Sequence, residues 1–163
     1  MATPTYTALA TTTLGSAAGS VTFSSIPAST YRDFIVVCNA KLASSSGTYW
    51  IRLNGDTGSN YSDLVMYGIG SGSGTSNSRT SQTVAYAGAI DTSDSMMIAQ
   101  IMDGGASDKH KTILIRENQP DSWVEARAAR WADNTQVSSI IVSNDASINF
   151  VAGSTFSLYG IEA

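Results

Sequence analysis

The sequence predicts an antiparallel all-β fold, and three observations support this prediction. Charged residues make up only 13% of the 163-residue chain, whereas 25 Ser and 17 Thr supply most of its polar groups. Apolar residues alternate with polar residues in short runs, which is the period of a strand with one buried face. Gly, Asn, Asp and Pro separate these runs and favour turns. We therefore expect an antiparallel β-sandwich or jelly roll of nine or ten short strands.

Length and composition indicate one domain that spans residues 1–163. A chain of this size buries about 70% of its unfolded surface, and 42% hydrophobic residues are enough to form that interior. Cys38 is the single cysteine, so no disulfide can form within the chain. We expect residues 1–7, which are polar and include Pro4, to form a flexible N-terminal arm that lies across a neighbouring subunit.

The charge pattern argues against nucleic acid and membrane partners. The net charge is -4, and the one basic patch is Lys109-His110-Lys111. A phosphate backbone requires a larger positive face. The N-terminus lacks the basic and apolar regions of a signal peptide, and no 18 apolar residues are consecutive. We expect a protein that is made and kept in a cytoplasm.

The first half of the chain contains a clear series of strand patterns. Asp33–Leu42 is apolar at both alternating sets of positions in its first half, which predicts a central strand covered on two sides. Asn54-Gly55 predicts a type I′ turn, because both residues tolerate a positive φ. Further strands are expected at Tyr6–Leu14, Ser20–Ile26, Tyr49–Leu53 and Tyr61–Ile69.

The second half begins with Gly68–Ser81, which is rich in Gly and Ser and predicts a long exposed loop. Asp121–Ala132 fits two structures. Ser122 and Glu125 form a capping-box pattern before helix-forming residues, but the segment also alternates like an edge strand, which we favour because it lies between strands. The remaining strands are expected at Gln82–Ile90, Met96–Met102, Lys111–Arg116, Val137–Ser143 and Thr155–Ile161.

No arrangement of residues predicts catalysis, a metal or a cofactor. His110 is the single histidine and has no nucleophile motif beside it, and Cys38 lies in the most apolar segment without a nearby positive charge. We interpret His110 as exposed and Cys38 as a core residue. The Gly68–Gly74 glycines lack the following helix that a phosphate loop requires.

Other polar groups are better explained by turns. A calcium ion would need oxygen ligands such as those of Asn54, Asp56, Asn60 and Asp63, but this spacing lacks the terminal Glu of an EF-hand loop. The carboxylate pairs Asp91/Asp94 and Asp121/Glu125 are interpreted as turn residues and a helix cap rather than a glycosidase pair. We expect most of a set of five aromatic residues to lie in the core or in a subunit interface, with a glycan site as the alternative: Trp50, Trp123, Trp131, Tyr61 and Tyr67.

Three segments carry a resemblance to a known group of proteins: TTTLGSAAGSVTFSSIPASTYRDFIVV at 11–37, IRLNGDTGSNYS at 51–62 and NFVAGSTFSLYGIEA at 149–163. They resemble small β-sandwich virion proteins of tailed bacteriophages, particularly cyanophages and marine phages. The resemblance implies a jelly-roll-like sandwich that is present in many copies on the virion, often as a trimer. It implies no catalytic residues and no cofactor.

The function we expect is therefore structural: a non-enzymatic cement, or decoration, protein on the outer surface of the capsid. Its partners would be the major capsid protein and copies of itself, most simply as a trimer. The N-terminal arm would contact the capsid through Met1, Thr3, Pro4 and Tyr6. The alternative is a tail-fibre or receptor-binding module that uses the same fold to bind host glycans.

Overall fold

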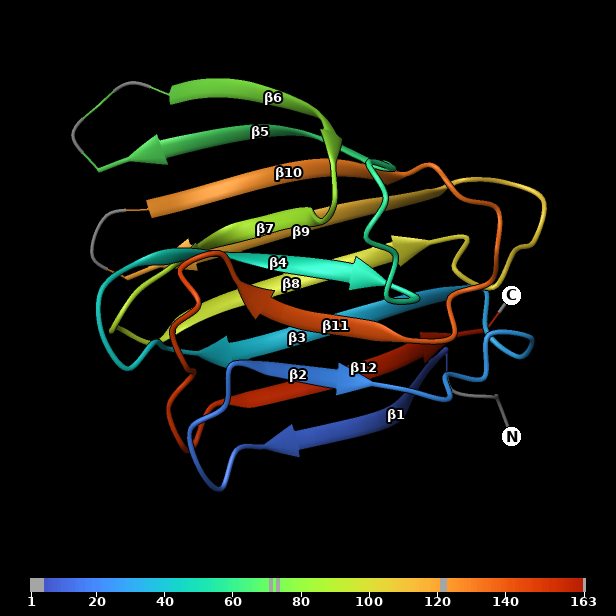
Figure 1. The fold of residues 1–163 in the computed structure, drawn as a ribbon, viewed down its shortest axis with the longest axis horizontal. Coiled ribbons are helices and arrows are strands. Elements are labelled where there is room, and N and C mark those ends of the chain that lie inside the picture. Colours follow the sequence, from blue (N-terminus) through green and yellow to red (C-terminus); the bar gives the residue numbers. More distant parts are fainter. Residues whose placement is uncertain (1–4, 71, 73, 121–122, 163) are drawn as a thin grey trace.

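The computed structural model describes residues 5–70, 72, 74–120 and 123–162, and it shows an all-β sandwich (Figure 1). An eight-stranded sheet packs against a four-stranded sheet, and all described strand pairs are antiparallel. The predicted antiparallel all-β sandwich is thus confirmed. The expected number of strands, nine or ten, is too low, because the described residues form twelve.

The large sheet has the order β1-β12-β3-β8-β9-β10-β5-β6, and the small sheet has the order β2-β11-β4-β7. The strands of the large sheet are β1 (Tyr6–Thr13), β12 (Thr155–Ile161), β3 (Asp33–Ala40), β8 (Ser95–Met102), β9 (Lys111–Gln119), β10 (Trp123–Trp131), β5 (Tyr61–Ile69) and β6 (Gly74–Gln82). The strands of the small sheet are β2 (Ser20–Phe23), β11 (Ile140–Asn144), β4 (Gly47–Leu53) and β7 (Ala85–Ile90).

The core lies between the two sheets and follows the alternation of the strands. In β3 the inward side chains from Phe34 to Cys38 are fully buried, whereas Ile35 and Val37 on the opposite face are half-buried. The aromatic centre of the core is Phe150, which stacks on Tyr49 and meets Phe156 edge to face. The prediction that β3 is covered on two sides is therefore wrong for the isolated chain, in which only its inner face is covered.

Eight of the strands form four pairs that are nested within one another in the sequence. β1 pairs with β12, β2 with β11, β3 with β8, and β4 with β7, so each later pair is nested inside the earlier ones. Successive pairs of this set alternate between the two sheets. Two hairpins, β5–β6 and β9–β10, interrupt the series: β9–β10 joins the large sheet next to β8, and β5–β6 follows next to β10.

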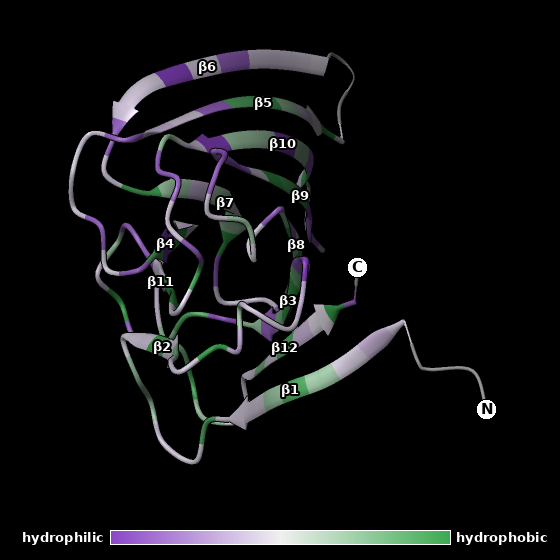
Figure 2. Cartoon of the chain, turned by 90° about the vertical axis from the view of Figure 1, so that its right-hand side faces the viewer, coloured by the Kyte–Doolittle hydropathy of each residue, from purple (hydrophilic) through white to green (hydrophobic). Residues whose placement is uncertain are grey.

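These two hairpins make the large sheet wider than the small one. β7 is the edge of the small sheet, and it lies over β9 and β10 (Figure 1). β5 and β6 extend beyond β7 at one end of the molecule, which is also visible when the sandwich is viewed along its strands (Figure 2). The inner face of the extension is therefore only partly covered.

The expected exposed loop at Gly68–Ser81 is wrong for most of its length. β5 continues to Ile69, and β6 begins at Gly74 and pairs with β5. β6 contains no large apolar residue and is largely exposed, so hydrophobic periodicity does not reveal it. A polar edge strand can form because its backbone hydrogen bonds to β5, and its polar side chains protect the edge from further pairing.

Three other segments test the expected elements. β10 is a strand, as favoured, and this overturns the interpretation of Glu125 as a helix cap. β9 continues past the expected end at Arg116 through residues 117–119, because these residues pair with β10 and β8. Asn54 and Gly55 have φ values of 53° and 66°, which confirms the turn. This turn leads from β4 in the small sheet to β5 in the large sheet rather than closing a hairpin.

The N-terminal segment is described from residue 5 onward, so Met1, Thr3 and Pro4 lie outside the described residues. Tyr6 and Thr7, which were expected to belong to the flexible arm, are the first residues of β1 and pair with Ile161 and Gly160. Among the described residues, no helix is long and apolar enough to cross a membrane.

Candidate functional site

The outer face of the large sheet is unusually apolar for a surface open to solvent. We call this surface the docking face; it consists of the side chains of the eight strands that point away from the small sheet. Val124 is 60% exposed and Met66 is 59% exposed. The large apolar side chains that are exposed on this face are Tyr6, Leu64, Met66, Met96, Leu114 and Val124.

The register between the strands places these residues in continuous rows. One row crosses the sheet from Tyr159 through Ile35, Gln100, Leu114 and Ala128 to Leu64. The next row crosses from Val37 through Ile98, Arg116 and Ala126 to Met66. Among the described strand residues of this face, the charged side chains are Asp33, Arg116 and Arg130.

The docking face is large enough for a specific protein interface. Strands lie about 4.8 Å apart and alternate residues about 7 Å apart, so eight strands with four outward residues each cover roughly 1,000 Å². A standard interface buries about 800 Å² on each partner. Monomeric proteins rarely expose an apolar patch of more than a few hundred Å². This face is therefore suited to contact with another protein.

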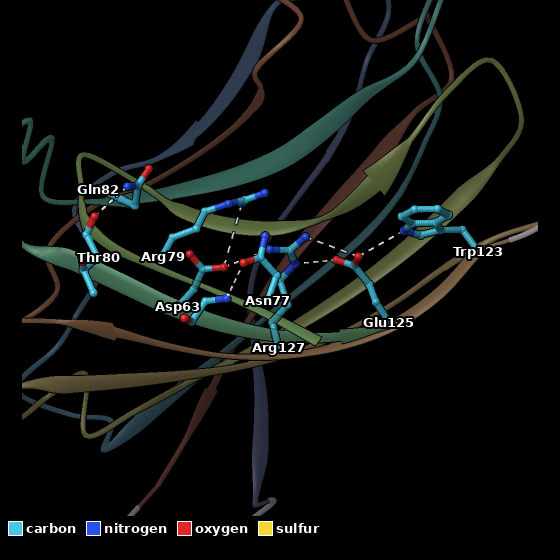
Figure 3. Close-up of polar contacts among 9 residues, drawn as sticks. Asp63, Asn77, Arg79, Thr80, Gln82, Trp123, Glu125 and Arg127 are labelled. Carbon is cyan, nitrogen blue, oxygen red and sulfur yellow. Dashed lines mark hydrogen bonds and ion pairs between the residues drawn. The ribbon is translucent and has the colours of Figure 1, made fainter. Parts of the chain in front are cut away.

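A second candidate site lies on the opposite, inner side of the extension formed by β5, β6 and β10. Its centre is Arg127 (Figure 3), which is buried between two carboxylates. Arg127 Nη1 donates to Asp63 Oδ2 at 2.9 Å, and Arg127 Nε donates to Glu125 Oε1 at 2.5 Å. Burying such charges costs free energy unless they are paired, and the pairing here compensates each carboxylate.

An open groove of about 180 Å³ lies beside this charged cluster. β5 contributes Tyr67, and β6 contributes Asn77 and Arg79. Trp123 stacks on Tyr67 with ring centroids 4.8 Å apart, and its indole Nε1 donates to Glu125 Oε2 at 3.1 Å. Thr48 of β4 and Ala89 of β7 complete the wall on the side of the small sheet.

Arg79 is incompletely paired. Its Nη1 lies 3.9 Å from Asp63 Oδ2, which is too long for a hydrogen bond, and this buried atom has no hydrogen-bond partner. Its guanidinium lies over the ring of Tyr86, 4.1 Å from the ring centroid. Asp63 Oδ1 is also buried without a hydrogen-bond partner. Unused hydrogen-bonding capacity thus lies in the buried cluster beside the groove, of which Arg79 lines the groove and Asp63 does not.

Glu117 lies on β9, next to Glu125 in the sheet and beneath β7. Burial raises the pKa of Glu117 to about 8, and the negative charge of Glu125 acts in the same direction. Neither carboxyl oxygen has a hydrogen-bond partner of normal geometry. At neutral pH this side chain is therefore mainly protonated and adds little charge to the cluster.

The structure separates most of the residues that the sequence singled out. Tyr6 is 59% exposed at the edge of the docking face. His110 is exposed, and Cys38 is fully buried, where desolvation raises the pKa of its thiol. Both interpretations of these two residues are confirmed.

Three of the four residues weighed as calcium ligands, Asn54, Asp56 and Asn60, lie in the turn between β4 and β5, as favoured from the sequence, whereas Asp63 lies in β5. Asp56 accepts hydrogen bonds from the Gly58 amide, from Asn60 Nδ2 and from Trp131 Nε1. Burial opposes the ionised form of Asp56, but the hydrogen bonds that it accepts leave its pKa below the usual value. Asp63 points to Arg127. Among the described residues, no group of three or more His, Cys, Asp or Glu side chains is placed to hold a metal ion.

The five aromatic residues fall into three environments. Trp131 and Tyr61 are buried and stack on each other, as expected for core residues. Trp50 lies on the small sheet, where the Arg52 guanidinium is 4.9 Å from its ring centroid. Trp123 and Tyr67 line the groove. The core interpretation is thus confirmed for two of them, while two others belong to a polar site.

Sequence reasoning missed Asp63, Arg79 and Arg127 as parts of a site. One signal was present in β10, where Glu125 and Arg127 alternate in phase with Trp131 and must therefore share its inward face. Arg79 gave no signal, because its strand has no apolar alternation.

Comparisons with known proteins add no identification. No family model matches the sequence, and no curated protein matches it. One solved structure aligned to this chain is a family two carbohydrate esterase from Cellvibrio japonicus, with 10% identity and a TM-score of 0.15. The alignment covers 96% of this chain and 33% of the esterase chain, so this chain spans about a third of that protein's length. A similarity at this TM-score carries no argument about fold or activity.

Proposed function

We propose that the protein is a non-enzymatic structural component of a bacteriophage virion: a cement protein that binds the outer surface of the capsid. The observation that carries this proposal is the docking face, with its exposed apolar side chains and few charges. The sequence resemblance to small virion proteins, given above, supplies the class of assembly. The protein would be made in the host cytoplasm and join the capsid as a folded unit.

The strand pairing supports the finer assignment to the jelly-roll type that is part of this proposal. Eight strands form the nested pairs β1–β12, β2–β11, β3–β8 and β4–β7, and these pairs lie alternately in the large and the small sheet, four of the strands in each. A jelly roll is an eight-stranded double sheet. The hairpins β5–β6 and β9–β10 would then be additions to this framework.

The chemistry of the described side chains supports a non-catalytic role. The Cys38 thiol is buried and its pKa is raised, so it is a poor nucleophile. Arg127, Asp63 and Glu125 are engaged with one another. A binding function uses the docking face directly and requires no reactive group.

Capsid melting tests the proposal. Particles stripped of this protein should melt at a lower temperature than the same particles after the purified protein is added back. Binding only to the assembled lattice stabilises it by about 2–3 kcal/mol per site at roughly a hundredfold excess over the dissociation constant, and this effect is repeated at every site. Leu114→Lys should abolish the gain, because it places a charge in the centre of the docking face.

Thr22→Lys is the matched control, because Thr22 is exposed on β2 of the small sheet, away from the docking face. This variant should restore the melting temperature as well as the unchanged protein does. Equal melting temperatures with and without the protein, together with lost adsorption to host cells, would instead establish the tail-fibre or receptor-binding module. Cryo-electron microscopy of intact particles gives an independent answer, because a cement protein occupies the capsid lattice in many copies.

A further inference from the structure

The groove beside Arg127 has the properties of a ligand site that the proposed cement function does not use. It lies on the inner face of β5, β6 and β10, whereas the docking face is formed by the alternate, outward residues of the same strands. Attachment through the docking face would therefore leave the groove accessible. The groove's volume of about 180 Å³ suits a small polar ligand of a single ring.

The charges around the groove favour an uncharged ligand. Arg79 and Arg127 are balanced by Asp63 and Glu125, and these four groups lie within one connected cluster (Figure 3). An anion would meet the two carboxylates, and a cation would meet the two guanidinium groups. A site of zero net charge therefore gives neither kind of ion a net electrostatic attraction.

The polar groups that line the groove suit a ligand with hydroxyl groups. Arg79 and Arg127 bring guanidinium donors to its wall, and Glu125 brings a carboxylate acceptor. A hydroxyl group accepts from a guanidinium and donates to a carboxylate, so a polyol matches both kinds of group.

The aromatic wall favours a ring with apolar faces. Trp123 and Tyr67 are stacked with an interplanar angle of 15°, and both line the groove. The hydrogen bond from Trp123 to Glu125 fixes the indole next to the polar groups. A pyranose ring combines C–H groups that pack on aromatic side chains with hydroxyl groups at its rim.

We propose that this groove binds one pyranose ring of a neutral saccharide, with Arg79 and Glu125 contacting its hydroxyl groups and Trp123 with Tyr67 forming the apolar wall. This inference goes beyond the cement function and does not depend on it. The proposed site takes a sugar unit as ligand and includes no reaction.

The three tryptophan indoles provide a direct test by NMR. Trp123 lies in the groove, whereas Trp131 donates to Asp56 and Trp50 lies on the small sheet. The indole signal of Trp123 is assigned as the one lost in Trp123→Phe. Titration with methyl glucoside, methyl mannoside, methyl galactoside and methyl N-acetylglucosaminide should shift this signal saturably for at least one glycoside. The signals of Trp50 and Trp131 should stay in place.

Arg79→Gln should weaken this binding about tenfold or more. Arg116→Gln, on the opposite face of the sheet, is the matched control and should bind as the unchanged protein does. If none of the glycosides gives a saturable shift of Trp123, or if glucuronate or inorganic phosphate binds more tightly than all of them, the proposal is wrong. Sugar binding that persists in Leu114→Lys would show that the groove binds its ligand independently of the docking face.

Discussion

At the scale of single residues, the protein buries a cluster of charged side chains beside β7, the edge strand of the small sheet. Arg127, Asp63 and Glu125 are almost fully buried, with side-chain exposures of 5%, 1% and 1%. Removing one partner of a buried ion pair costs about 3–5 kcal/mol, because the other charge is left uncompensated. Such a cluster is weak evidence for stability and a better indication of a site at which polar groups are needed.

The carboxyl of Glu117 should make stability depend on pH. Its pKa is about 8 in the folded protein and 4.5 in an unfolded chain, so the unfolded state loses this proton first as pH rises. The contribution of Glu117 to the free energy of unfolding therefore falls between pH 4.5 and pH 8 and is constant above that range.

We expect Glu117→Gln to remove this decline. The variant should melt several degrees above the unchanged protein at pH 8 and close to it at pH 4.5, since about 1 kcal/mol shifts the melting temperature of a chain of this size by about 2–4 °C. Thermal melts followed by circular dichroism across this range measure the difference. Glu162→Gln, a substitution at an exposed position, should leave the melting temperatures of the unchanged protein as they are at every pH. A constant offset between the Glu117→Gln and unchanged curves at all pH values would contradict the prediction.

At the scale of elements, the two hairpins β5–β6 and β9–β10 carry both candidate sites. Their outward residues include Leu64, Met66 and Leu114, which belong to the docking face. Their inward residues include Asp63, Arg79 and Arg127, which form the charged cluster. The alternation of a strand thus gives one extension two chemically different faces.

The close approach of β7 to β9 requires a glycine. Gly88 has a φ of +117°, and a Cβ atom there would lie 2.3 Å from Glu117 Cγ. We expect Gly88→Ala to lower the free energy of unfolding by about 2–4 kcal/mol, because backbone strain and overpacking act together. Urea denaturation measures this loss.

Gly153→Ala is the matched control that measures the cost of backbone strain alone. Gly153 has a φ of +88°, but a Cβ atom there would meet nothing within 4 Å. This variant should lose only about 1–2 kcal/mol. Equal losses in the two variants would mean that the contact between β7 and β9 contributes nothing to the cost.

At the scale of the whole molecule, the large sheet separates two surfaces. The docking face points away from the small sheet, and the groove opens on the inner side beside the small sheet. One protein can therefore bind a large flat partner and a small ligand at the same time. This separation also makes the two proposals independently testable.

We expect the isolated protein to form a homotrimer with cyclic symmetry, as the resemblance to virion proteins implies. Light scattering should give about three times the mass of one chain. Met66→Lys should remain trimeric, because we assign the docking face to the capsid rather than to the trimer contact. A monomeric protein would contradict the first expectation. Dissociation of Met66→Lys would assign the docking face to the trimer and remove the proposed attachment surface.

The sequence by itself determined the all-β class and most strand positions, because both depend on local properties. Alternation located strands such as Tyr61–Ile69 and Thr155–Ile161 within their actual bounds. The turn at Asn54-Gly55 follows from which residues tolerate a positive φ. The apolar pattern on both faces of β3 was also visible, and in the structure it marks part of the docking face.

Only the tertiary structure decided which strands are neighbours, and hence which side chains meet. β6 was missed because an exposed edge strand is held by backbone hydrogen bonds, which leave no hydrophobic period in the sequence. Asp63, Arg79 and Arg127 come from three strands, and they meet because β10 and β6 flank β5 in the sheet. The pairing order depends on contacts between distant segments, and local periodicity carries no information about those contacts.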